Sequence, residues 1–164
     1  MSAYVGTQQG DDKCLLVGGT MAPNLPGVWE TLDPFEPGKV TYRARLEDKA
    51  LAGKLAERFA LIQVHAVFEH VNPLYYAACV RNLHTMLKPG GIVSVEVPWL
   101  WAYHPRDKRY DFGGDFARFT DEGLRRLFEE HPACQWTTLV CEYAVPEDCP
   151  DGVGVCALFR KEAN

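Results

Sequence analysis

No apolar run in this 164-residue sequence approaches the roughly 20 residues that a membrane-spanning helix needs. Residues 1–13 contain no basic stretch followed by an apolar one, so no secretory signal is predicted. None of the six cysteines forms a CxxC pair and the five histidines are scattered, so no metal site is predicted. The formal net charge of −5 gives no electrostatic basis for binding nucleic acid or an anionic membrane. We therefore expect a cytoplasmic protein that binds neither nucleic acid nor membranes.

The composition is that of an ordinary folded domain. Hydrophobic residues make up 47% of the chain and charged residues 24%, which is usual for soluble globular proteins. A chain of this length is long enough for one domain with its own hydrophobic core. No repeat, low-complexity block or linker divides it. We expect a single domain over residues 1–164, in which the polar residues 1–12 are loosely held.

Hydrophobic patterning predicts seven strands and at least three helices. Asp48, Asn72 and Thr120 are the expected helix caps, and Pro89-Gly90-Gly91 is expected to end the second of these helices. Because only a short segment (144–152) joins the last two strands, they are predicted to form an antiparallel pair at a sheet edge. The expected strands are residues 14–17, 28–32, 40–45, 61–64, 92–97, 136–143 and 153–159.

Strands that alternate with helices indicate an α/β protein with a mostly parallel sheet, most simply a three-layer sandwich. Residues 20–27, between the first two strands, contain two prolines and leave little room for a helix. The first crossover helix is therefore predicted to be reduced or missing. The helix after Asp48 is expected to carry Leu51, Leu55 and Phe59 on one face.

A series of short motifs gives the sharpest indication of function. The motifs are FALI from Phe59, VFEHV from Val67, LKPGG from Leu87, VP from Val97, then His104, and DFARFT from Asp115. In this order they resemble the class I S-adenosylmethionine-dependent methyltransferases, in particular the small stand-alone methyltransferase domains. Each motif alone is weak, whereas the ordered set is fairly specific. The resemblance implies a Rossmann-like methyltransferase fold and S-adenosylmethionine as cofactor.

The resemblance also implies which residues hold the cofactor. Family members carry a GxGxG loop after the first strand, against which the methionine part of the cofactor lies, and here only a degenerate pair of glycines remains. The family's acidic residue at the end of the second strand corresponds to Asp33, which could accept hydrogen bonds from both ribose hydroxyls. Asp before Pro is equally a common turn starter. The implied cofactor-binding residues are Gly18, Gly19, Asp33, Leu46, Glu47 and His65.

Aromatic residues follow the fifth strand, where ligands of open α/β sheets bind. Trp99, Trp101 and Tyr103 alternate, so they share one side if the strand continues. They either close over a substrate or form a small hydrophobic core beneath the loop 102–119. We assign them to the acceptor side of the predicted site.

Two polar residues complete the predicted acceptor side. His104 is the best candidate general base, since a near-neutral imidazole can take a proton from an attacking hydroxyl. It could instead be a structural residue that pins the loop. Arg118 either contacts an anionic or sugar substrate or pairs with Asp115, three residues earlier.

The sequence thus predicts methyl transfer from S-adenosylmethionine to a small-molecule or sugar acceptor, at oxygen, with His104 as base. The degenerate glycine loop, and Ala60 where relatives carry Asp, keep open a non-catalytic domain of this fold that acts as a binding or assembly partner. A different nucleotide-binding α/β enzyme, such as a reductase, is disfavoured by the absence of GxGxxG. A homodimer could cover the sheet face that a missing helix would expose.

Overall fold

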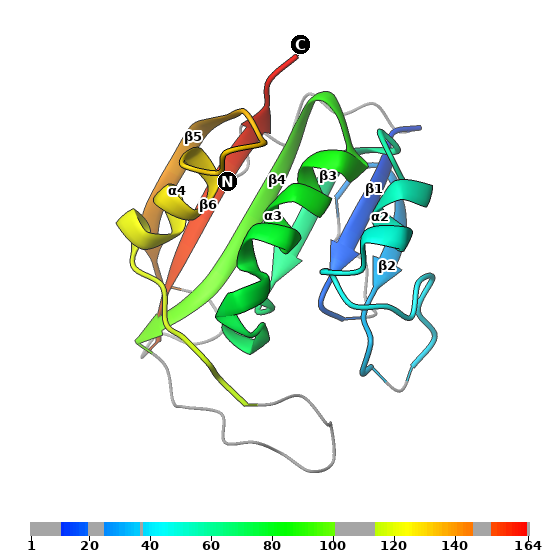
Figure 1. Cartoon of the computed structure of the whole chain (residues 1–164). Coiled ribbons are helices and arrows are strands. Elements are labelled where there is room, and N and C mark those ends of the chain that lie inside the picture. The colour runs from blue at the N-terminus through cyan, green and yellow to red at the C-terminus, as the bar shows by residue number, and fades with distance from the viewer. Residues whose placement is uncertain (1–10, 20–24, 37, 101–113, 146–151, 164) are drawn as a thin grey trace.

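The structure is a computed structural model, and it describes residues 11–19, 25–36, 38–100, 114–145 and 152–163 (Figure 1). The strands are β1 (Lys13–Val17), β2 (Val28–Leu32), β3 (Phe59–His65), β4 (Leu87–Leu100), β5 (Trp136–Ala144) and β6 (Val153–Lys161). The helices are α2 (Lys49–Lys54), α3 (Tyr76–Met86) and α4 (Asp121–Glu129), with short 3-10 turns η1 (Phe68–His70) and η2 (Pro73–Tyr75). None of these helices is long and apolar enough to cross a membrane.

The strands form one sheet in the order β2-β1-β3-β4-β6-β5. The neighbours from β2 to β4 pair in parallel, and β6 pairs antiparallel with both β4 and β5. The predicted antiparallel hairpin is confirmed, with β5 at the sheet edge. Because β1, β2 and β3 run in the same direction, their carboxyl ends meet at one edge of the sheet (Figure 1).

The predicted count of seven strands is wrong for the described residues, which form six. The segment 40–45 makes a single parallel bridge, from Tyr42 to Leu32. Side chains take the place of a longer ladder there: the N–H of Thr31 donates to Thr41 Oγ1 at 3.1 Å, and the N–H of Thr41 donates to Thr31 Oγ1 at 2.9 Å. Arg43 donates hydrogen bonds to the carbonyls of Glu36 and Gly38 in the preceding loop.

One of the expected helix boundaries also differs, and a second lies partly outside the described residues. Asp48 caps α2 as predicted, but the helix stops at Lys54, and Phe59 is already the first residue of β3. Between β1 and β2, the described residues 18–19 and 25–27 are not helical, and residues 20–24 lie outside the described part. The reduced first crossover helix therefore remains a prediction.

The described helices α2, α3 and α4 all lie on the same face of the sheet (Figure 1). Between them and the strands lies an apolar core of fully buried side chains. Its β-sheet side includes Leu15, Ile62, Val64, Val93, Val95, Val155, Ala157 and Phe159. The predicted third layer is not represented among the described residues.

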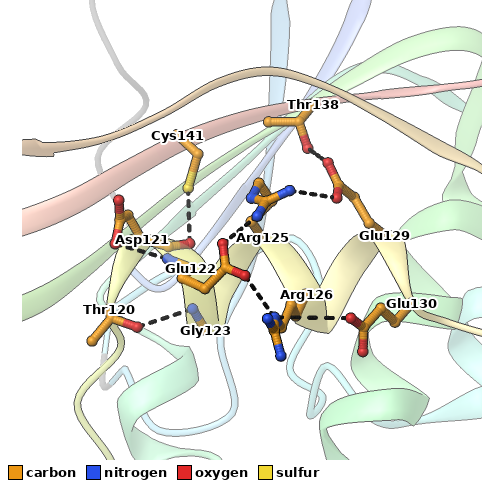
Figure 2. A network of polar contacts seen from close by, with 10 residues as sticks. All are labelled: Thr120, Asp121, Glu122, Gly123, Arg125, Arg126, Glu129, Glu130, Thr138 and Cys141. Atoms are coloured by element: carbon orange, nitrogen blue, oxygen red, sulfur yellow. Dashed lines mark hydrogen bonds and ion pairs between the residues drawn. The ribbon is translucent and has the colours of Figure 1, made fainter.

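Helix α4 covers the antiparallel end of the sheet. Thr120 caps it as predicted, since Thr120 Oγ1 accepts a hydrogen bond from the N–H of Gly123 at 2.9 Å. Its inner face buries Phe128, which stacks on Phe159 of β6 with ring centroids 4.1 Å apart. Its outer face carries a network of ion pairs, in which Glu122 binds both Arg125 and Arg126 (Figure 2). The apolar side chains of α4 are thus packed against the sheet, and its charged side chains pair with one another in solvent.

Candidate active site

A pocket of about 600 Å³ lies where β1, β2 and β3 end. Val17, Leu32 and His65, the last residues of these strands, all line it. This is the edge at which open α/β sheets bind ligands. All six residues that the resemblance assigned to the cofactor line this one pocket: Gly18, Gly19, Asp33, Leu46, Glu47 and His65.

Gly18 is required by the close packing of the first loop against β3. Its φ of +89° lies in the left-handed region. A Cβ there would lie 2.4 Å from the carbonyl oxygen of His65 and 2.6 Å from Cγ2 of Val67. Gly19 also has a positive φ, +123°, but a Cβ there would meet nothing within 4 Å. The first glycine therefore anchors the loop, while the second leaves open space beside it.

Asp33 joins the loops that follow β1 and β2. Its Oδ1 accepts hydrogen bonds from the N–H groups of Phe35 (2.7 Å) and Glu36 (2.8 Å), and its Oδ2 accepts one from Gly19 (3.0 Å). The turn that an Asp-Pro pair suggests is therefore present, in a carboxylate that also lines the pocket. A carboxylate oxygen can accept two hydrogen bonds, so Oδ2 retains acceptor capacity.

Residues 45–47, which precede α2, form another wall of the pocket. Leu46 is buried, and its carbonyl accepts a 2.8 Å hydrogen bond from the buried Asn82 side chain of α3. Arg45 lies 3.8 Å from the Glu47 carboxylate, and its guanidinium lies 4.9 Å from the centre of the Phe35 ring. This wall thus combines carboxylate, cation and aromatic surface.

The end of β3 bends sharply into the pocket. His65 Nδ1 lies 3.3 Å from Oε2 of Glu96 on β4, and this hydrogen bond lowers the pKa of Glu96. The next residue, Ala66, has a φ of 50°, which is strained for a residue other than glycine. Its N–H donates to the carbonyl of Glu96 at 3.0 Å, which holds it there. The chain is therefore turned toward the pocket at a cost in backbone strain.

The VFEHV segment brings charged groups close to the pocket. His70 lines it, and its Nδ1 lies 3.1 Å from the carbonyl of Gly114 and 3.2 Å from Oδ1 of Asp115. Oδ2 of Asp115 accepts a 2.7 Å hydrogen bond from Arg118 Nη2. Glu69 is 1% exposed, and burial, with a further contribution from Asp115, raises its pKa to about 7.

The predicted acceptor side is not assembled in the described residues. Trp99 is half-buried, with its ring centroid 6.2 Å from that of Tyr143, and does not line the pocket. Arg118 makes the predicted pair with Asp115 and does not line the pocket either. Trp101, Tyr103 and His104 lie outside the described residues.

Several residues line the pocket that sequence reasoning did not assign to it. Asn72 and Tyr75 follow the VFEHV motif, and Phe116 belongs to DFARFT. The motifs could have pointed to these residues, because segments that share an ordered family pattern tend to meet at one site. The described residues hold no group of three side chains able to bind a metal ion.

Comparison with solved structures shows the fold. An S-adenosylmethionine-dependent methyltransferase from Methanosarcina mazei is 12% identical, with a TM-score of 0.69 over 100% of this chain and 99% of that one. The 1,6-didemethyltoxoflavin-N1-methyltransferase of Burkholderia thailandensis, solved with its substrate and S-adenosylhomocysteine, is 15% identical, with a TM-score of 0.70 over 98% and 74%. A candidate Zn-dependent alcohol dehydrogenase from Rhodobacter sphaeroides is 12% identical, with a TM-score of 0.70 over 97% and 87%.

No family model and no curated protein matches the sequence. The structural likeness, at this level of identity, concerns the fold and not the activity. The chain has the class I S-adenosylmethionine-dependent methyltransferase fold, as the sequence motifs implied.

Proposed function

We propose that this protein binds S-adenosylmethionine in the pocket and transfers its methyl group to a small-molecule acceptor. The observation that carries the proposal is the meeting of Gly19 and Asp33 at the ends of β1 and β2. The first leaves open space beside the chain, and the second offers a carboxylate oxygen with remaining acceptor capacity. The Burkholderia thailandensis relative in fold, solved with S-adenosylhomocysteine, supports the same ligand class.

The residues present fit the cofactor. Gly18 and Gly19 would lie along its methionine part, and Asp33 would accept hydrogen bonds from its ribose hydroxyls. Leu46 and Glu47 would contact the adenine, and His65 would lie beside them. A volume of about 600 Å³ falls within the usual range of small-molecule sites, roughly 300–1,000 Å³.

The protein's contribution to such a reaction is alignment. When bound, the cofactor supplies a sulfonium methyl group that is ready for displacement. Holding an acceptor in line with that methyl group can contribute roughly 7–11 kcal/mol through effective concentration. Phe35, Tyr75 and Phe116 line the pocket, and aromatic faces suit a sulfonium cation.

The finer features of the reaction remain predictions. We propose an oxygen acceptor on a small molecule or sugar, with His104 as a candidate base and Trp99, Trp101, Tyr103 and Arg118 on the acceptor side. These roles rest on the sequence. So do the cytoplasmic location, the single domain over residues 1–164 and a homodimer that covers the second sheet face.

A non-catalytic domain of the same fold is the second candidate. Three backbone N–H groups already engage Asp33, so this carboxylate has a structural role that needs no cofactor. In that case the protein would act as a binding or assembly partner.

Calorimetric titration with S-adenosylmethionine and S-adenosylhomocysteine separates the two candidates. We expect micromolar binding that is roughly 10- to 100-fold weaker in Asp33→Ala, because a hydrogen bond to a charged group contributes about 1.5–3 kcal/mol. Asp121→Asn changes a carboxylate on α4, away from the pocket, and should bind as the wild type does. If the folded wild type binds neither ligand, the enzyme proposal fails and the non-catalytic candidate stands.

A further inference from the structure

The VFEHV and DFARFT segments bring a histidine that lines the pocket together with two carboxyl groups, Glu69 and Asp115. The His70 side chain is 20% exposed and lines the pocket, whereas the Asp115 side chain behind it is 1% exposed. Arg118 holds the far oxygen of Asp115 at 2.7 Å. Asp115 is thus buried between a cation and an imidazole, in a fixed orientation.

Hydrogen bonding selects one tautomer of His70. Both atoms next to Nδ1 are acceptors: the Gly114 carbonyl oxygen at 3.1 Å and the Asp115 carboxylate oxygen at 3.2 Å. A proton on Nδ1 satisfies the Gly114 carbonyl, with the Asp115 carboxylate close by, and the neutral ring then carries its lone pair on Nε2. A carboxylate beside Nδ1 also stabilises the imidazolium that forms when Nε2 takes a second proton. This is the arrangement of an oriented general base.

The other charged groups around His70 are few among the described residues. Oε1 of Glu69 lies 3.9 Å from Nε2, and burial favours the protonated form of this carboxyl. Arg118 donates a 2.7 Å hydrogen bond to Oδ2 of Asp115. His65 lies further along the pocket wall, where it is paired with Glu96. His70 therefore lines the pocket with the carboxyl groups of Asp115 and Glu69 beside it.

We propose that His70 is the general base of the methyl transfer and that Asp115 is its positioning residue. The inference rests on the proposed function and deepens it, since it requires an acceptor whose attacking atom carries a hydrogen, N–H or O–H. The acceptor's lone pair forms the new bond to the methyl carbon, and the carbon–sulfur bond breaks with its electrons going to sulfur. The acceptor's proton passes to Nε2, which leaves an imidazolium beside Asp115 and S-adenosylhomocysteine as the second product.

The test compares two ligands and needs no acceptor. Sinefungin carries an amine-bearing carbon in place of the methylsulfonium, so its ammonium group occupies the position of the transferred methyl. S-adenosylhomocysteine has no group there. Calorimetry gives the ratio of the two affinities for each variant. A base that faces the methyl position should bind the ammonium and therefore favour sinefungin.

We expect His70→Ala to lower the ratio about tenfold or more while the affinity for S-adenosylhomocysteine stays near that of the wild type. His70→Phe, which keeps a ring without nitrogens, should do the same and serves where the alanine variant is unstable. Asp115→Asn should lower the ratio less and change the tautomer of His70 in ¹⁵N NMR spectra of the imidazole. His131→Ala changes a histidine outside the pocket and should leave the ratio unchanged.

Three results would overturn the inference. An unchanged ratio in both His70 variants would place the ring away from the methyl position. A loss of sinefungin preference in His104→Ala, with none in the His70 variants, would assign the base to His104. If the folded wild type binds neither ligand, the proposed function itself fails, and calorimetry on the wild type alone distinguishes that case.

Discussion

The two ends of the sheet are built differently. At the β4-β6-β5 end, Phe128 stacks on Phe159 with the ring planes 4° apart, and Trp136 packs edge-on against Phe128. At the β2-β1-β3 end, the strands run into Gly18, Gly19 and Ala66, all with positive φ. The first end is closed by apolar contacts, and the second opens into a pocket.

The distribution of charge follows the same division. On α4 the charged groups lie in solvent and pair with one another (Figure 2). Beside the pocket, Glu69 and Asp115 are buried, which costs stability unless each charge is compensated. The hairpin end therefore stabilises the fold, while the pocket end keeps strained and desolvated groups that a binding site uses.

The largest effect should come from the aromatic stack of the hairpin end. Phe128→Ala removes a fully buried ring, and we expect the free energy of unfolding to fall by about 3–5 kcal/mol. Urea denaturation monitored by circular dichroism measures it. Glu122→Gln removes exposed ion pairs from the same helix and should leave the midpoint nearly unchanged. If the two variants lose similar stability, the apolar stack is not what stabilises the hairpin end.

The buried carboxyl of Glu69 should make the pocket end sensitive to pH. Burial raises its pKa from 4.5 to about 7, so between these values the folded protein binds more protons than the unfolded chain. The free energy of unfolding should therefore fall as pH rises from 4.5 to 7 and level off above. The pKa difference corresponds to about 3 kcal/mol.

Glu69→Gln should remove that part of the pH dependence. Urea midpoints of the wild type and the variant, measured from pH 4.5 to pH 8, should converge at low pH and separate at high pH, with the variant more stable. Glu130→Gln, at an exposed residue directly after α4, should follow the wild type at every pH. Parallel curves for the wild type and Glu69→Gln would show that Glu69 does not titrate in this range.

Much of the fold could be predicted from local chemistry. Thr120 and Asp48 cap helices because their side chains accept backbone hydrogen bonds, and the short segment after Ala144 permits only an antiparallel return. The strand expected at 40–45 failed because its alternation carries no information about partners. Thr41 and Arg43 bond to nearby groups, and these local bonds replace a sheet ladder.

Some residues of the candidate site could be predicted from the sequence, and others could not. Residues at strand ends, such as Gly18 and Asp33, could be placed because the sheet topology brings those ends together. The sequence did not assign His70 to the site, because its partners Gly114 and Asp115 are more than 40 residues away in sequence. No local sequence pattern predicts a contact between residues so far apart in the chain. The ordered motifs VFEHV and DFARFT contain its main residues without indicating that they touch.

The two glycines of the first loop give the smallest and most selective effect. Gly18→Ala combines a positive φ with close approach to the His65 carbonyl, and should cost about 2–3 kcal/mol of stability. Gly19→Ala meets no atom within 4 Å, so it should cost only backbone strain, about 1 kcal/mol.

Ligand affinity should distinguish the two glycines in the reverse order: Gly19→Ala costs less stability but should weaken binding strongly. The Gly19→Ala methyl group enters open space beside Asp33, where the methionine part of the cofactor would lie, so binding of S-adenosylhomocysteine should weaken by more than the small loss of stability suggests. Thermal unfolding and calorimetry on both variants test this. Equal losses of stability would show that the loop is not anchored against β3, because only Gly18 makes that contact. Unimpaired binding in Gly19→Ala would place the ligand elsewhere in the pocket, since a methyl group there cannot coexist with a molecule in contact with that backbone.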